Sequence, residues 1–519
     1  MGKDNKRGMY GVLETVIASA AALVLFLLTV MMLEGRAYMP MNWHERIVFK
    51  NNGIFFYIAL AACIAALFAL FRFIAKIPQK ALFIFCNAVF AAAGLFLIIN
   101  APSELRADAG SVYGAAESFN DGNYDVLNFG KYMYMYPHQL GLATFWRPFA
   151  ALGCGAYAAF AVNLVMAFAA NFALWSSARL VYGENSPAVN YVCIMLFLFL
   201  PHLFFILFAY GTTPGLCFLC FSLYFGVKYF KGKGRFGGIW CVVFAVLSCI
   251  VRNNNYIGAL AIGAGFALYA IKERKPVHLA YPAAMLAAAV LSLSLIKWGY
   301  GAAAGAPVND GMPKTLWIAM GLQDNDLRMD GWSNTYNEQT YLQYHRDSKK
   351  SSAAAKANIK ERLEYFADNP DRAYKFFSNK IRSTWTEPTF QSLWSGPLED
   401  CGQQVKTGFL KNLYGGGTAY EAVNGFCAVV TALIYICSLG GLVYNLASRR
   451  KTGFFGLTVC MYLAGGFLFH IIWETKSQYV YPYVYMLIPF AAGALAQAAG
   501  AVNNFFHKKE IVYKKRQHD

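Results

Sequence analysis

Long apolar segments alternate with short polar connections along most of the chain. The first, Tyr10–Leu33, is about 24 residues long, enough to cross a bilayer as a helix. A cleaved secretory signal would have a shorter apolar core, so we expect a retained first helix. The same criterion predicts about twelve spans in all. They are Tyr10–Leu33, Ile54–Ala75, Ala81–Asn100, Ala156–Leu180, Val189–Leu207, Gly215–Phe230, Gly238–Val251, Tyr256–Ile271, Leu279–Trp298, Ala422–Ala447, Gly453–Trp473 and Val480–Ala498.

Two much longer segments, residues 101–155 and 299–421, interrupt this pattern. The second has roughly 120 residues, too many for a simple connection. It includes a helical stretch, Ser352–Lys380, and we expect a small, mostly helical cap domain there. The predicted parts are helices one to three (1–100), a loop (101–155), helices four to nine (156–298), the cap (299–421), the last three helices (422–498) and a basic tail (499–519).

The composition indicates a polytopic, all-α membrane protein. Hydrophobic residues make up 57% of the chain and charged residues 14%, and the mean hydropathy is +0.37. A soluble domain has roughly a quarter charged residues, so soluble enzymes and secreted disulfide scaffolds are poor fits. Most of the 12 cysteines lie in apolar runs, where cysteine behaves as a small hydrophobic residue. Neither disulfides nor a zinc site are indicated.

The formal net charge of +17 arises largely from basic clusters beside the predicted spans. With the N-terminus inside, every tight cluster falls on one side, as the positive-inside rule requires. The clusters are Lys76/Lys80, Arg179, Lys228/Lys231/Lys233/Arg235, Lys272/Arg274/Lys275, Arg449/Arg450/Lys451 and Lys508/Lys509/Lys514/Lys515/Arg516. We therefore expect both termini in the cytoplasm, both long segments outside, and no nucleic-acid partner. The layout is typical of a bacterial plasma membrane protein.

Asp108 lies just beyond a span, near the start of the first long outside segment. An amphipathic stretch follows, and then an aromatic run that ends in Tyr136-Pro137-His138-Gln139. A carboxylate, an imidazole and tyrosine rings are thus expected at one membrane–water boundary. That combination is typical of sugar-handling sites, although tyrosines at this depth also form ordinary aromatic belts.

Two basic residues on the outer side depart from the general charge pattern. Arg252 follows a span and precedes Asn253–Asn255, so it needs an anion or a polar network; a tight turn between helices is the alternative. Lys476 lies beside Glu474 near the end of another span. It is either a phosphate ligand or a snorkelling lysine in an ion pair.

Three features together resemble a known class of membrane enzyme. The first is the outside loop that runs from Asp108 through Asp121–Tyr124 to Tyr136–Gly141. The second is the helix end Ser176–Gly183, and the third is Trp473–Pro482, which opens the last helix. Their layout resembles the GT-C glycosyltransferases, near the bacterial protein O-mannosyltransferases and aminoarabinose transferases.

The resemblance implies a GT-C-like fold and sugar transfer on the outer face of the membrane. The donor would be a sugar on a polyprenyl phosphate, and the acceptor a glycan, lipid or protein. Asp108 matches the family's catalytic Asp and would be the general base of an inverting reaction. Tyr136 and His138 would help to bind the substrates, the latter because the charge of a histidine is adjustable near neutral pH.

The phosphate of the donor needs cations, because they stabilise the charge that develops on the leaving group. Lys476 matches the family's motif and is the first candidate, with Glu474 and Tyr479 beside it; Arg252 is the second. Many relatives have a second acid where this chain has Ala109. A divalent metal is therefore left unassigned, and no other cofactor is indicated.

Two other functions stay open. A transporter or flippase for lipid-linked saccharides would share the topology, but transporters usually have short loops and related halves. A polymerase or ligase of surface polysaccharide would use Arg and His in the large loop in place of an early Asp. Convergence of Asp108, Arg252 and Lys476 on one cavity would favour the glycosyltransferase.

Overall fold

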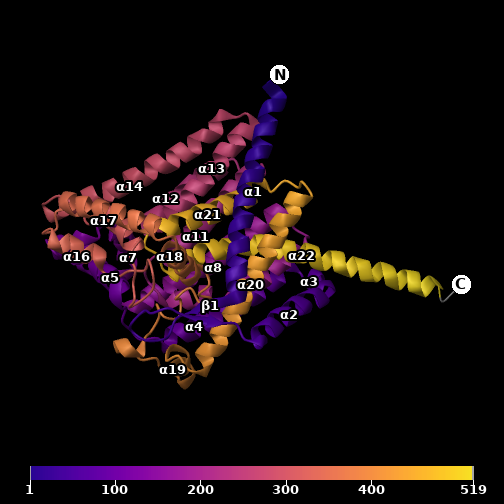
Figure 1. Cartoon of the computed structure of the whole chain (residues 1–519), viewed down its shortest axis with the longest axis horizontal. Coiled ribbons are helices and arrows are strands. Elements are labelled where there is room, and N and C mark those ends of the chain that lie inside the picture. The colour runs from indigo at the N-terminus through magenta and orange to yellow at the C-terminus, as the bar shows by residue number, and fades with distance from the viewer. Residues whose placement is uncertain (1, 517–519) are drawn as a thin grey trace.

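The computed structural model describes residues 2–516, with side chains from Gly8 to Phe505 (Figure 1). All five basic side chains predicted in the tail, residues 499–519, lie outside the described side chains. The described chain is almost entirely helical, apart from two short strands, β1 (Gly35–Tyr38) and β2 (Val48–Asn51). These strands pair antiparallel, with Gly35 opposite Asn51 and Tyr38 opposite Val48.

Within residues 2–516, eight helices are long and apolar enough to cross a membrane. A ninth span results if α9 (Pro187–Leu198) counts together with the bent segment α10 (Pro201–Phe204) and η3 (Phe205–Leu207), at 53° to it. The eight are α1 (Gly2–Glu34), α4 (Gln79–Asn100), α8 (Ala156–Tyr182), η4 (Asn253–Asn255) with α13 (Tyr256–Glu273), η5 (Pro276–Leu279) with α14 (Ala280–Ala304), α20 (Thr418–Ala447), α21 (Gly453–Ile472) and α22 (Ser477–Arg516).

The three other predicted spans are helical but fall outside that set. The segment at Ile54–Ala75 is divided into α2 (Ile54–Ala69) and α3 (Phe71–Lys76). The remaining two are α11 (Thr212–Phe230) and α12 (Gly237–Val251), the latter only 15 residues long. A helix thus lies in each predicted segment, whereas eight or nine of the described segments are long and apolar enough to cross a membrane.

The helices bury one another in the centre and expose apolar side chains at the periphery. Only 11% of the most apolar stretch of η5 and α14 is buried inside the protein. In α14 the side chains of Leu291 and Trp298 are 58% and 73% exposed. In water such a surface would be costly, whereas lipid solvates it. The fold therefore defines a multi-pass membrane protein.

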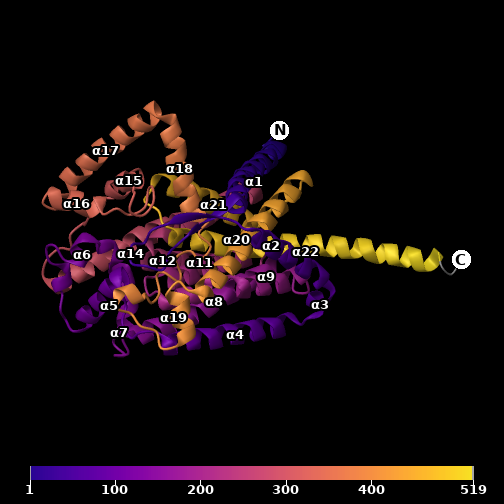
Figure 2. The same ribbon diagram turned by 60° about the horizontal axis from the view of Figure 1, so that its bottom comes forward.

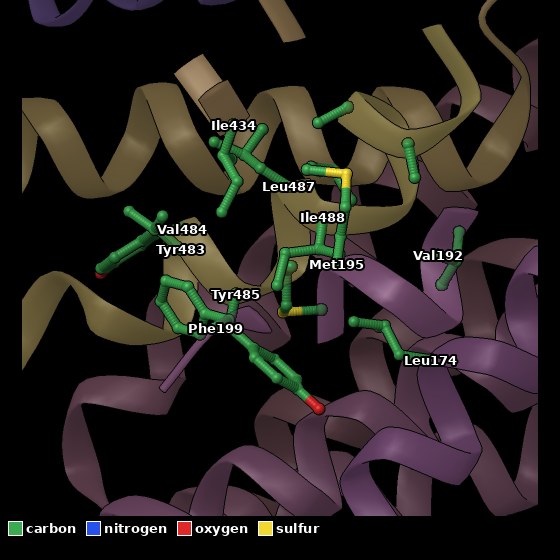
Figure 3. Packing of buried hydrophobic residues seen from close by; sticks show 14 of the residues in the cluster. Leu174, Val192, Met195, Phe199, Ile434, Tyr483, Val484, Tyr485, Leu487 and Ile488 are labelled. Atoms are coloured by element: carbon green, nitrogen blue, oxygen red, sulfur yellow. The ribbon is translucent and has the colours of Figure 1, made fainter. Parts of the chain in front are cut away.

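The centre of the bundle is built around α22, which packs against α9, α20 and α21. Figure 3 shows Val484, Leu487 and Ile488 of α22 beside Ile434 of α20 and Met195 of α9. The rings of Tyr483 and Tyr485 point to different sides of α22, because residues two apart in a helix lie on nearly opposite faces.

The first long connection, residues 101–155, forms short helices at one end of the bundle. They are α5 (Ala107–Asn120), η1 (Asp125–Leu127), α6 (Tyr132–Met135), η2 (Pro137–Gln139) and α7 (Leu140–Ala150). Val112, Ala116 and Phe119 of α5 are buried, as the amphipathic pattern predicted.

The second long connection, residues 299–421, contains five α-helices. They are α15 (Thr315–Gly321), α16 (Tyr336–Gln343), α17 (Ser348–Asp368), α18 (Pro370–Trp385) and α19 (Gly408–Tyr414), with η6 (Glu399–Cys401). The single helical stretch predicted at Ser352–Lys380 is broken at Asn369, because Pro370 starts a new helix. Figure 2 shows α17 and α18 as a hairpin whose bend projects from the molecule, while α17 packs against α15 and α16 and α18 packs against α21 and α22.

Candidate functional site

Asp108 lies in the first turn of α5, where the partial positive charge of a helix N-terminus favours a carboxylate. Its side chain is exposed and therefore accessible to a substrate. Its charge acts on the hydroxyl of Tyr210. Burial and then the charge of Asp108 raise the pKa of Tyr210 above its ordinary value. Asp108 is thus exposed to solvent, and its charge reaches the half-buried Tyr210.

Tyr210 joins Asp108 to Arg252. A guanidinium nitrogen of Arg252 donates to the backbone oxygen of Tyr210 at 2.7 Å. The guanidinium carbon lies 4.7 Å from the centre of the Tyr210 ring and 5.9 Å from that of Tyr479. Arg252 takes part in none of the ion pairs formed within the described chain. Its charge is therefore balanced by tyrosine rings and a carbonyl and by no carboxylate.

The aromatic run before α7 surrounds the same tyrosine. The hydroxyl of Tyr132 lies 3.3 Å from that of Tyr210, and the side-chain amide of Gln139 donates to the Tyr210 hydroxyl at 2.7 Å. Tyr136 donates its hydroxyl to Glu338 of α16 and so connects this run to the second long segment. The predicted neighbourhood of Asp108 and Tyr136 is therefore present.

His138 stands near Arg252 but does not carry the adjustable charge expected of it. Burial, together with the charges of Arg252 and Lys314, lowers the pKa of His138 to about 4. The imidazole is consequently neutral at neutral pH, and it offers a hydrogen bond in place of a charge. Its ring lies edge-on to Trp317 of α15, with 6.0 Å between the ring centres.

Lys476 has a different partner from the one expected. Its ammonium nitrogen lies 2.6 Å from the carboxylate of Glu45, which belongs to the turn between β1 and β2. The other oxygen of Glu45 pairs with Arg328 at 2.7 Å, and the amide of Gln391 donates to the carboxylate at 3.1 Å. Burial would raise the pKa of Glu45, but these charges and hydrogen bonds together lower it. Because Glu45 compensates its charge, Lys476 is less available to a phosphate than Arg252.

Glu474 is buried next to this cluster. Its pKa is raised to about 7, mainly by burial and further by the charge of Glu45, against the opposing effects of Lys476 and Tyr479. A second buried group, Lys380 of α18, donates to the backbone oxygen of Ile471 at 2.9 Å. Burial lowers its pKa to about 7, and the charge of Glu474 opposes this shift. Glu45 and Lys380 are residues that sequence reasoning missed.

One pocket adjoins this region, between the start of α11, η4, α21 and the first turns of α22. Arg252 and Tyr479 line it, whereas Asp108 and Lys476 do not. Asp108 approaches it through Tyr210, and Lys476 lies two residues before Gln478, which is part of the lining. Asp108, Arg252 and Lys476 therefore do not converge on this pocket, because Arg252 alone lines it.

Across the described part of the chain, no cluster of three or more His, Cys, Asp or Glu side chains forms a potential metal site. The fold and this network of polar residues define the class of protein, a polytopic all-α membrane protein. Comparison with protein-family models, curated proteins and solved structures found no match.

Proposed function

We propose that the protein is a membrane glycosyltransferase that moves a sugar from a polyprenyl-phosphate donor to an acceptor hydroxyl. The observation that carries the proposal is the Asp108–Tyr210–Arg252 contact. It places an exposed carboxylate and a guanidinium without a carboxylate partner on one tyrosine. A base beside a cation is what the reaction requires, since one group accepts a proton while the other stabilises a leaving phosphate.

In the proposed reaction the acceptor oxygen attacks the anomeric carbon of the sugar. Its proton passes to Asp108, and the bond between the anomeric carbon and the phosphate oxygen breaks with both electrons left on the phosphate. Arg252 stabilises that charge. A single displacement of this kind inverts the anomeric configuration, and it needs neither a covalent enzyme intermediate nor a co-reactant.

The proposal includes a finer topology of twelve spans with both termini in the cytoplasm. Its support is the set of connections that meet near Asp108. Tyr210, Arg252, Lys476 and Glu45 all belong to connections that the charge pattern assigns to the outer face. The second long segment would then form an extracytoplasmic cap, which is linked to the site by the hydrogen bond from Tyr136 to Glu338.

The test is consumption of labelled polyprenyl-phosphate sugars by purified protein, with Asp108→Asn as the variant. Loss of the general base should lower turnover on the order of a hundredfold. Asp121→Asn is a matched control, because it removes an exposed carboxylate from the end of the same helix. Equal turnover in the Asp108 variant and the wild type would discard Asp108 as the base. Binding of donors without any consumption would favour the transporter.

A further inference from the structure

The pocket beneath Arg252 contains an unusual set of polar atoms. Thr212, Gln478 and Tyr483 line it and are only 4%, 8% and 2% exposed. The Thr212 hydroxyl, the side-chain oxygen of Gln478 and the Tyr483 hydroxyl have no hydrogen-bond partner. Burial of a polar atom without a partner is costly, so native interiors contain few of them. Three such atoms in one pocket indicate a ligand or water that provides the missing partners.

Pro482 of α22 and Arg252 also line the pocket. Its lining therefore combines neutral hydroxyl and amide groups with one cation, the guanidinium of Arg252.

This combination suits the oxygens of an anion. The guanidinium has five N–H groups, and one of its nitrogens is engaged with the carbonyl of Tyr210 at 2.7 Å. The hydroxyls of Thr212 and Tyr483 rotate to donate, and a half-turn of the Gln478 amide presents its NH₂ group in place of its oxygen. A phosphate held by Arg252 would extend an oxygen toward these donors.

We infer that this pocket is a phosphate-binding site in which Arg252 supplies the charge and Thr212, Gln478 and Tyr483 supply neutral hydrogen bonds. The inference rests on the proposed function, and it identifies the residues that hold the phosphate of the donor and of the released polyprenyl phosphate. The site recognises an anionic phosphate group, whether it belongs to a lipid or is free in solution.

The test uses the full chain in detergent and the variants Thr212→Val and Tyr483→Phe, singly and together. Both changes keep the shape of the side chain and remove an unpaired hydroxyl, so the ligand-free protein should be as stable as the wild type or more stable. Affinity for polyprenyl phosphate should fall by about tenfold per hydroxyl removed. Thr431→Val is the matched control, because Thr431 in α20 also has a buried hydroxyl without a partner.

Three probes separate the sources of the anion. Polyprenyl phosphate, polyprenol without phosphate, and inorganic phosphate are each titrated against thermal unfolding. Stabilisation by polyprenyl phosphate alone assigns the site to a lipid, and stabilisation also by inorganic phosphate assigns it to phosphate from either source. Both results support the site when the double variant weakens them and the Thr431 variant does not.

Other outcomes overturn the inference or the proposed function separately. Undiminished affinity in the double variant, with donor turnover intact, would mean that the pocket holds only structural water, while the glycosyltransferase would stand. Weakened phosphate binding in a protein that consumes no donor would retain the site and overturn the enzyme. A wild-type protein that binds none of the three probes would overturn the site.

Discussion

Replacement of Glu45 by Gln should destabilise the protein far more than its place in a short turn implies. The carboxylate is 3% exposed and compensates two cations, Lys476 at 2.6 Å and Arg328 at 2.7 Å. The neutral amide would leave both cations without a counterion, and the side chain of Lys476 is only 15% exposed. Removal of one member of a buried ion pair typically costs about 3–5 kcal/mol. Because Arg328 is 29% exposed and partly hydrated, we expect the free energy of unfolding to fall by about 3 kcal/mol.

The effect should depend on pH in a defined direction. The pKa of Glu45 is lowered in the folded protein below its ordinary value of 4.5. The charged Glu45 carboxylate therefore stabilises the folded protein fully above that pH. The contribution is lost as the pH falls through the folded pKa. The stability difference between wild type and Glu45→Gln should therefore narrow in acid.

The assay is unfolding in mixed micelles followed by tryptophan fluorescence, at about pH 7 and below about pH 4. Glu421→Gln is the control, since Glu421 pairs with Lys50 at 3.2 Å but both side chains are well exposed, at 47% and 38%. Exposed pairs contribute less than about 1 kcal/mol. The reasoning would be refuted if Glu45→Gln and Glu421→Gln lowered the free energy of unfolding equally. It would also be refuted if the stability difference between the wild type and Glu45→Gln at neutral pH persisted in acid.

Two further variants test the groups around Tyr479. Burial raises the pKa of Glu474 to about 7, so folding binds a proton there and stability falls as the pH rises from 4.5 to about 7. Glu474→Gln should abolish this fall in pH-dependent melts and be more stable than the wild type above pH 7, by up to about 3 kcal/mol. Arg252→Met should weaken binding of polyprenyl phosphate about ten- to a hundredfold in a titration, and Arg252→Lys should weaken it less because the charge remains.

The arrangement near Asp108 could be anticipated because ends of spans on one side of a membrane must lie in one plane. Asp108 and Arg252 each follow an apolar run, so their approach depends only on the topology. The break between α17 and α18 also had a signal, namely Pro370 after Asn369, but helical periodicity on both sides concealed it.

The partner of Lys476 could not be anticipated in this way. Glu45 lies in the turn between β1 and β2, whereas Arg328 and Gln391 lie in two separate loops of the second long connection. Each resembles an ordinary solvated loop residue, and only the packed structure makes one buried carboxylate neutralise two cations. Glu474, two residues before Lys476, was the natural partner from sequence alone, yet the ion pair that Lys476 forms is with Glu45. Long-range pairing of this kind leaves no local pattern.

Tyr210→Phe separates the two roles that the site assigns to one tyrosine. The variant keeps the ring that lies 4.7 Å from the guanidinium of Arg252 and the backbone oxygen that accepts its hydrogen bond. It removes the hydroxyl that contacts Asp108 and accepts from Gln139. If Tyr210 positions the base, kcat should fall about tenfold while the KM for the donor stays unchanged, because one neutral hydrogen bond contributes roughly 1 kcal/mol.

The matched control for that experiment is Tyr157→Phe in α8, which removes a hydroxyl that donates to the backbone oxygen of Ala101 at 3.2 Å. It should alter neither constant. A higher KM with unchanged kcat in Tyr210→Phe would instead mean that the hydroxyl serves donor binding. In that case the Asp108 carboxylate would be oriented by the first turn of α5 alone. The split between the two constants therefore decides whether the contact that carries the proposed function acts in chemistry or in binding.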